Sequence, residues 1–122
     1  MRAAGLHAIA TVLQTEAVLI KSSTTKHPAL EPLINVITSR IAGVVAASRY
    51  VVCQYNIARD KLVEATGVTP GRRAPTISPL EEEGWVAVSV MVEKAKTADV
   101  MDELVNVGAT DIMIFNLDNC RV

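Results

Sequence analysis

The chain has 122 residues, with 12 Lys and Arg against 13 Asp and Glu, so its formal net charge is −1. This length corresponds to one domain of ordinary size, or to one small domain with an appendage. Half of the residues are apolar, which argues against disorder. The balanced charge and the four aromatic residues (one Trp, two Tyr, one Phe) offer little attraction for phosphate backbones and few platforms for bases. Nucleic acid is therefore not expected as a partner.

The cysteines and histidines do not indicate a metal site or a disulfide framework. Cys53 and Cys120 are too few for a disulfide scaffold, and His7 and His27 do not combine with them at any zinc-binding spacing. No apolar run approaches the roughly 18 to 20 residues of a membrane span, and the first five residues lack a signal-peptide pattern. We therefore expect a cytoplasmic chain without a bound metal and without membrane association.

Residues 1–28 have the pattern of one part of a larger structure. Residues 9–13 and 17–20 are rich in β-branched side chains and predict one long strand or two short ones. Residues 1–5 are typical of the last turn of a helix that glycine ends, which indicates either a truncated element or a frayed terminus. Because an isolated two-stranded element is marginal in water, the strands are expected to join a sheet in a longer chain or in a partner subunit.

Residues 29–48 predict a long helix. Pro28 and Pro32 favour a helix start, and the apolar residues that follow are spaced by three and four: Leu30, Leu33, Ile34, Ile37, Ile41, Val44 and Val45. At 1.5 Å per residue the helix would be roughly 30 Å long. Such a helix is long enough to connect two bodies, and its apolar stripe is equally compatible with the core helix of a single body.

Residues 49–122 predict a ferredoxin-like domain. Strands are expected over residues 50–56, 75–80, 85–92 and 111–117, and helices over residues 59–66, ended by Gly67, and 97–107, capped by Thr97 and ended by Gly108. This β-α-β-β-α-β order places both helices on one face of an antiparallel sheet. The predicted fold class is α+β: a ferredoxin-like βαββαβ domain preceded by a long connecting helix and orphan strands.

No residue pattern indicates catalysis. A nucleophile needs a base within hydrogen-bond reach, and both histidines lie outside the predicted compact domain. The acidic residues 81–83 could form a metal-binding loop, but three adjacent carboxylates are more typical of a solvated turn. Cys120, a free thiol near the C-terminus, is expected to be inert. No catalytic residue is therefore assigned.

Residues 69–76, with the sequence Thr-Pro-Gly-Arg-Arg-Ala-Pro-Thr, are the strongest candidate for a binding loop. Two prolines and a glycine fix the backbone path, while Arg72, Arg73 and Thr76 offer donors that suit a carboxylate or a phosphate. The alternative is a stiff connection with two solvated arginines. Neither a GxGxxG nor a P-loop spacing is present, so a nucleotide cradle has no support from a motif.

Several ordered segments resemble the C-terminal part of the long-form ATP phosphoribosyltransferases, which join ATP to phosphoribosyl pyrophosphate in the first step of histidine biosynthesis. The segments are residues 69–78 (TPGRRAPTIS), 83–88 (EGWVAV), 101–104 (MDEL), 108–112 (GATDI), 119–122 (NCRV), 40–44 (RIAGV) and 1–6 (MRAAGL). The likeness covers essentially the whole chain.

This resemblance implies a domain organisation: residues 1–28 as the tail of a second catalytic lobe, 29–48 as a connecting helix and 49–122 as the regulatory domain that binds histidine for feedback inhibition. The family's phosphoribosyl-binding loop lies upstream of these segments, so the chain alone is expected to be inactive and without a cofactor. For the complete enzyme the resemblance implies Mg²⁺ and a hexamer that assembles through the regulatory domains.

The resemblance also implies that histidine binds where regulatory domains meet, with contacts from Asn56, Arg72, Ala74, Thr76, Met91 and Asp111. Many bacterial members have Asp at the position of Asn56. Two other functions stay open at this point. The chain could be catalytically competent by itself or with a separate catalytic subunit, or it could be a structural oligomerisation module that binds no ligand.

Overall fold

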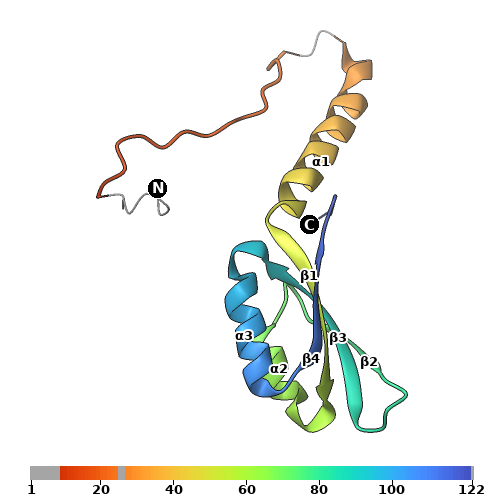
Figure 1. Cartoon of the computed structure of the whole chain (residues 1–122). Helices are drawn as coiled ribbons and strands as arrows, with labels where there is room; N and C mark the ends of the chain where they lie inside the picture. Colours follow the sequence, from red (N-terminus) through yellow and green to blue (C-terminus); the bar gives the residue numbers. More distant parts are fainter. Residues whose placement is uncertain (1–8, 25–26, 122) are drawn as a thin grey trace.

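The computed structural model describes residues 9–24 and 27–121, and the helix end expected over residues 1–5 lies outside them. The elements follow the predicted order (Figure 1). They are η2 (Pro28–Leu30), α1 (Glu31–Ala47), β1 (Tyr50–Ala58), η3 (Arg59–Lys61), α2 (Leu62–Val68), β2 (Thr76–Pro79), β3 (Trp85–Glu93), η4 (Lys94–Lys96), α3 (Thr97–Val107) and β4 (Thr110–Asn116), where η marks a 3₁₀ turn. The predicted α+β class and ferredoxin-like arrangement are confirmed.

The four strands form one antiparallel sheet in the order β2-β3-β1-β4. Helices α2 and α3 cover one face of this sheet (Figure 1). No described element covers the opposite face, which we call the open face. The register places Val52 beside both Met91 and Phe115 on the open face, and Gln54 beside Ser89 and Met113.

The hydrophobic core lies between the sheet and the two helices. Alternate residues of the two central strands point into it, as the period of two in a half-covered strand requires. Its buried members are Val51, Cys53, Tyr55 and Ile57 from β1, Val86, Val88, Val90 and Val92 from β3, and Ala65, Leu104, Val107 and Ala109 from the helical layer and its exit.

One polar pair is buried in this core. The Thr69 hydroxyl donates to the carbonyl oxygen of Ala65 at 3.1 Å, so the Tyr55 hydroxyl, 2.8 Å from Thr69 Oγ1, is the donor of the second bond. Both side chains are fully buried. Because each polar atom has a partner, the pair avoids the penalty of an unsatisfied buried group. It also fixes the first residue of the 69–76 loop against α2.

Burial raises the pKa of the Tyr55 phenol, with the Thr69 hydrogen bond acting in the opposite direction, and it raises the pKa of the Cys53 thiol. The ordinary pKa values are 9.0 for a cysteine thiol and 10.0 for a tyrosine phenol. Above these values the folded chain therefore holds more protons at Cys53 and Tyr55 than the unfolded chain. Their contribution to stability is fully present below those values and is lost as the pH rises past them.

We therefore expect the free energy of unfolding to fall above about pH 9. Tyr55→Phe should lower stability by about 1 kcal/mol at neutral pH, because one hydrogen bond is lost, and should flatten the alkaline decline. Urea unfolding from pH 7 to 10.5 measures both effects. An equally steep decline in wild type and variant would contradict this role of Tyr55.

Three local predictions are not met. The strands expected within residues 9–20 are not formed, because a strand needs a partner and residues 9–24 pair with no strand in the described part of the chain. Gly67 does not end α2, which continues to Val68. Thr97 does not cap α3. It is the first residue of that helix, and its hydroxyl donates to the Lys94 carbonyl oxygen at 2.9 Å.

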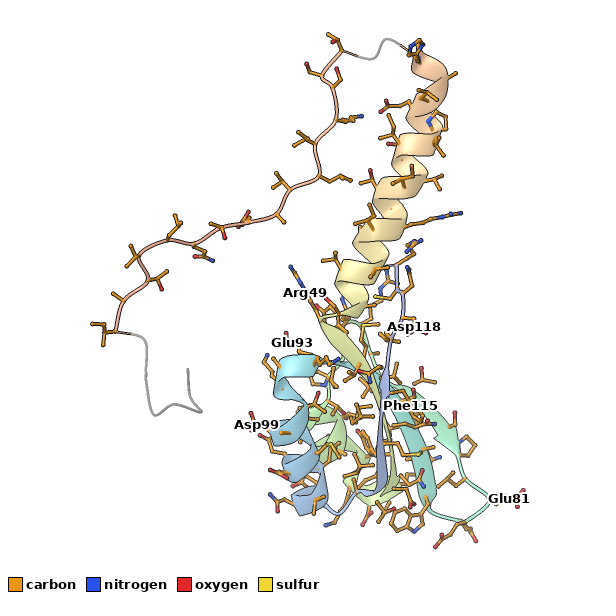
Figure 2. All side chains as sticks on the ribbon, turned by 45° about the horizontal axis from the view of Figure 1, so that its top comes forward. Arg49, Glu81, Glu93, Asp99, Phe115 and Asp118 are labelled. Carbon is orange, nitrogen blue, oxygen red and sulfur yellow. The ribbon has the colours of Figure 1, made fainter. Side chains whose placement is uncertain are left out.

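Helix α1 projects away from the compact body (Figure 1). Only Gly43 and Ala47 are buried among its 17 residues, whereas Ile37 and Val44 are 47% and 54% exposed. The structure therefore does not support α1 as the core helix of this body. The C-terminal residues 117–121, which we call the tail, run beside the lower end of α1, as the position of Asp118 in Figure 2 shows.

Residues Pro28–Ala47 are also long and apolar enough, with a mean hydropathy of 1.3, to cross a membrane on length and composition alone. This corrects the expectation that no run approaches such a span. The large apolar residues lie within one half of the helix surface, which also holds Arg40. Glu31, Asn35 and Ser39 follow one another on the other half at steps of four, beside Ala42 and Ala46. A one-sided stripe of this kind is typical of a helix that packs against protein along one side.

Candidate functional site

The six residues expected to contact an effector fall into two groups on the domain. Asn56 and Asp111 come together where β1 meets the start of β4. The other four lie on or beside the 69–76 loop: Arg72, Ala74, Thr76 and Met91.

The first group is built around a β-bulge. The pairing of β1 with β4 shifts between Gln54 and Asn56, and Asp111 has a positive φ of 50°. Aspartate tolerates this left-handed conformation better than most residues, and such backbone features cluster at functional sites. The Asp111 carboxylate accepts hydrogen bonds from Asn56 Nδ2 at 3.0 Å and from Thr110 Oγ1 at 3.3 Å. Asn56 therefore orients a carboxylate that remains exposed to solvent.

The second group depends on the backbone of the loop. Gly71 has a φ of 67°, and a Cβ at this position would lie 2.8 Å from Val90 Cγ2, so the turn needs glycine for both conformation and space. Pro70 and Pro75 restrict the residues on either side. The Arg72 guanidinium lies over the Tyr50 ring, 5.7 Å from its centroid. The loop is therefore rigid and holds Arg72 against an aromatic face.

Two cavities flank this loop, and Arg72 and Met91 line both of them. One, of about 340 Å³, includes Tyr50, Glu93 and Lys96, and the last two form an exposed salt bridge of 2.9 Å. The other, of about 400 Å³, is lined by Arg72, Arg73, Ala74, Met91 and Arg121. The loop thus separates a cavity with charges of both signs from one with positive charges alone.

The two groups of residues lie at separate places on the sheet of one chain. Thr76 pairs with Ser89, and Ser89 pairs with Gln54, which places Thr76 two strands from β1 and two residues from the level of Asn56. At about 4.8 Å per strand and 3.4 Å per residue, the Cα atoms of Thr76 and Asn56 are roughly 12 Å apart. Neither Asn56 nor Asp111 lines either of the two cavities that flank the loop.

The open face between the groups mixes polar and apolar side chains. Met113 and Phe115 are 45% and 48% exposed on β4, and Val52 and Met91 are half-buried beside them. Large apolar residues that lie together on a surface often mark a site of interaction. This face can therefore bury apolar area against another protein surface.

Sequence reasoning missed several residues at the loop: Tyr50, Glu93, Lys96 and Arg121. Nothing in their local sequence marks them, because only the strand register and the path of the tail bring them to the loop. The acidic residues 81–83 are exposed, and Glu81 lies at the tip of the β2–β3 hairpin (Figure 2). Within residues 9–24 and 27–121, no three His, Cys, Asp or Glu side chains lie close enough to share a metal ion.

Known proteins are similar to this chain along its whole length. A family model described as HisG, C-terminal domain, matches residues 47–119, more than half of the chain. Proteins named ATP phosphoribosyltransferase from Yarrowia lipolytica and Saccharomyces cerevisiae are each 57% identical over 122 residues, and the one from Schizosaccharomyces pombe is 49% identical over 121 residues. These matches include 99 to 100% of this chain but only 39 to 40% of each relative, so the chain spans about 40% of their length.

Proposed function

The chain belongs to the HisG C-terminal domain family, and we propose that it is the effector-binding part of an ATP phosphoribosyltransferase, the enzyme that opens histidine biosynthesis. The likeness to proteins of that name along all 122 residues supports this proposal. The reaction of ATP with phosphoribosyl pyrophosphate then needs residues beyond this chain, which by itself is inactive. The Mg²⁺ of the complete enzyme belongs with those residues, and the site of action is the cytoplasm.

The effector is histidine, held between two copies of the domain. The observation that carries this proposal is that, within one chain, Asn56 and Asp111 line neither of the two cavities beside the loop. The Asp111 carboxylate, oriented by Asn56, accepts hydrogen bonds from the ammonium or the imidazole of histidine. Thr76 and the loop of the neighbouring copy supply donors to the carboxylate. Charge-assisted hydrogen bonds of this kind are about twice as strong as neutral ones.

Self-association through the open face supplies the second copy. It covers Met113 and Phe115, which are about half exposed in the single chain, and it brings the two groups of effector residues together. Assembly to a hexamer would repeat this contact. Feedback then needs a coupling of only about 1 to 3 kcal/mol between histidine binding and the placement of the catalytic lobes, which α1 connects to this domain.

Calorimetric titration of the folded, self-associated chain with histidine tests the proposal. We expect Thr76→Ala to weaken binding about tenfold, because the loss of one hydrogen bond to a charged group costs about 1.5 kcal/mol. Ser78→Ala is the matched control. Ser78 lies on the same strand and face, two residues further along, and is also exposed. The histidine affinity of the Ser78→Ala variant should therefore change less than twofold.

Sedimentation of the same samples reports whether self-association is intact. An assembled wild-type chain that gives no heat with histidine would contradict the effector role and favour a purely structural oligomerisation module. Equal losses in Thr76→Ala and Ser78→Ala would contradict the placement of the site at Thr76.

A further inference from the structure

The cavity of about 400 Å³ beside the loop has three arginine side chains in its lining and no acidic one. Arg72 and Arg73 come from the loop, and Arg121 comes from the tail, about 50 residues away in the sequence. All three are exposed. Ala74 and Met91 complete the lining and offer no charge.

None of these guanidinium groups is neutralised by a carboxylate in the described part of the chain. The salt bridges found there are Lys96–Glu93 and Lys21–Glu31, which involve none of the three arginines. Like charges around one cavity repel one another and concentrate positive potential in it. A bound anion would remove this repulsion.

Two of the three side chains are already positioned. Arg72 is held over the Tyr50 ring, and Arg121 contacts Asn119, whose side-chain amide donates to the Arg40 carbonyl oxygen at 3.5 Å. A guanidinium is a planar fork of donors that matches the oxygens of a phosphate group. Because less side-chain freedom is lost on binding, such positioning increases affinity.

We propose that this cavity binds a small oxyanion with at least two negative charges, of the phosphate or diphosphate class. Three positive charges, with no acidic side chain in the described lining, favour a multiply charged anion over the single negative charge of a carboxylate. The inference goes beyond histidine binding. Since Arg72, Ala74 and Met91 also belong to the proposed effector residues, the two sites are neighbours and share part of the loop.

The experiment is a titration of the chain with inorganic phosphate and, separately, with pyrophosphate at constant ionic strength, followed by NMR shifts of the backbone amides of Arg72, Arg73 and Arg121. We expect all three signals to shift together and pyrophosphate to bind more tightly than phosphate. This order identifies a diphosphate ligand, whereas equal affinities identify a single phosphate group. Arg73→Gln and Arg121→Gln should each weaken binding about tenfold, as expected when a charge-assisted hydrogen bond is lost.

Arg59→Gln is the control, because Arg59 lies in η3 after the opposite end of β1. The affinity of the Arg59→Gln variant for both anions should change less than twofold. Absence of saturable shifts with both anions, unchanged affinity in both Arg73→Gln and Arg121→Gln, or an equal loss in Arg59→Gln would overturn the inference. A histidine titration of the wild-type chain separates the two proposals. Absence of anion binding with histidine binding intact sinks this inference alone, while absence of histidine binding with anion binding intact sinks the effector role alone.

Discussion

Leu104→Ala is expected to lower the free energy of unfolding by about 3 kcal/mol, within the range of about 2 to 5 kcal/mol for buried leucine truncations. Leu104 lies on α3 with no exposed surface, at the centre of the layer that packs α2 and α3 on the sheet. Its removal leaves a cavity that the neighbouring β-branched residues of β1 and β3 cannot fill. Domains of this size have a total stability of only about 5 to 15 kcal/mol, so the loss is a large fraction of it.

Urea unfolding measures this effect, with Val105→Ala as the matched control on the same helix. Val105 is 62% exposed, and alanine favours a helix more than valine does, so its replacement should change stability by less than about 0.5 kcal/mol. A similar m-value in all three proteins would show that the same surface unfolds. Equal stability of the two variants would mean that Leu104 does not anchor the core.

The compact domain is predictable from sequence because its signals are local. Val86, Val88, Val90 and Val92 alternate along one strand, and Gly108 takes the left-handed conformation, φ 96°, that ends α3 at the predicted residue. The bounds of the strands differ from the predicted ones by at most two residues. Residues 9–20 fail for a different reason, because β-propensity says nothing about whether a partner strand is present.

The candidate site is predictable only in part. The backbone of the 69–76 loop is marked by its prolines and by Gly71, but the grouping of Asn56 with Asp111 depends on a bulge that local sequence does not reveal. Arg121 reaches the loop because the tail continues from β4 beside the lower end of α1 (Figure 1). Long-range placement of this kind depends on the assembled fold and not on spacing in the sequence.

The tail also forms a contact that should transmit histidine binding to α1. Strand β4 begins beside Asp111, and the chain that leaves it crosses α1 at Gly43, where the Cys120 amide donates to the Gly43 carbonyl oxygen at 3.1 Å. A Cβ at Gly43 would lie 2.9 Å from the Cys120 carbonyl oxygen, so glycine is needed for this crossing. One continuous segment therefore joins Asp111, a proposed effector residue, to α1.

Gly43→Leu is expected to release the tail from α1 and to raise the hydrogen-exchange rate of the Cys120 amide at least about tenfold, because its hydrogen bond is lost. Gly67→Leu is the matched control, since Gly67 also lies within a helix and a Cβ added there would meet no atom within 4 Å. In Gly67→Leu the Cys120 amide should exchange as in wild type.

Histidine affinity should change less than twofold in Gly43→Leu, whereas the histidine-induced protection of α1 amides should disappear. Unchanged Cys120 exchange in Gly43→Leu, or full protection of α1 by histidine in that variant, would show that coupling does not pass through the tail.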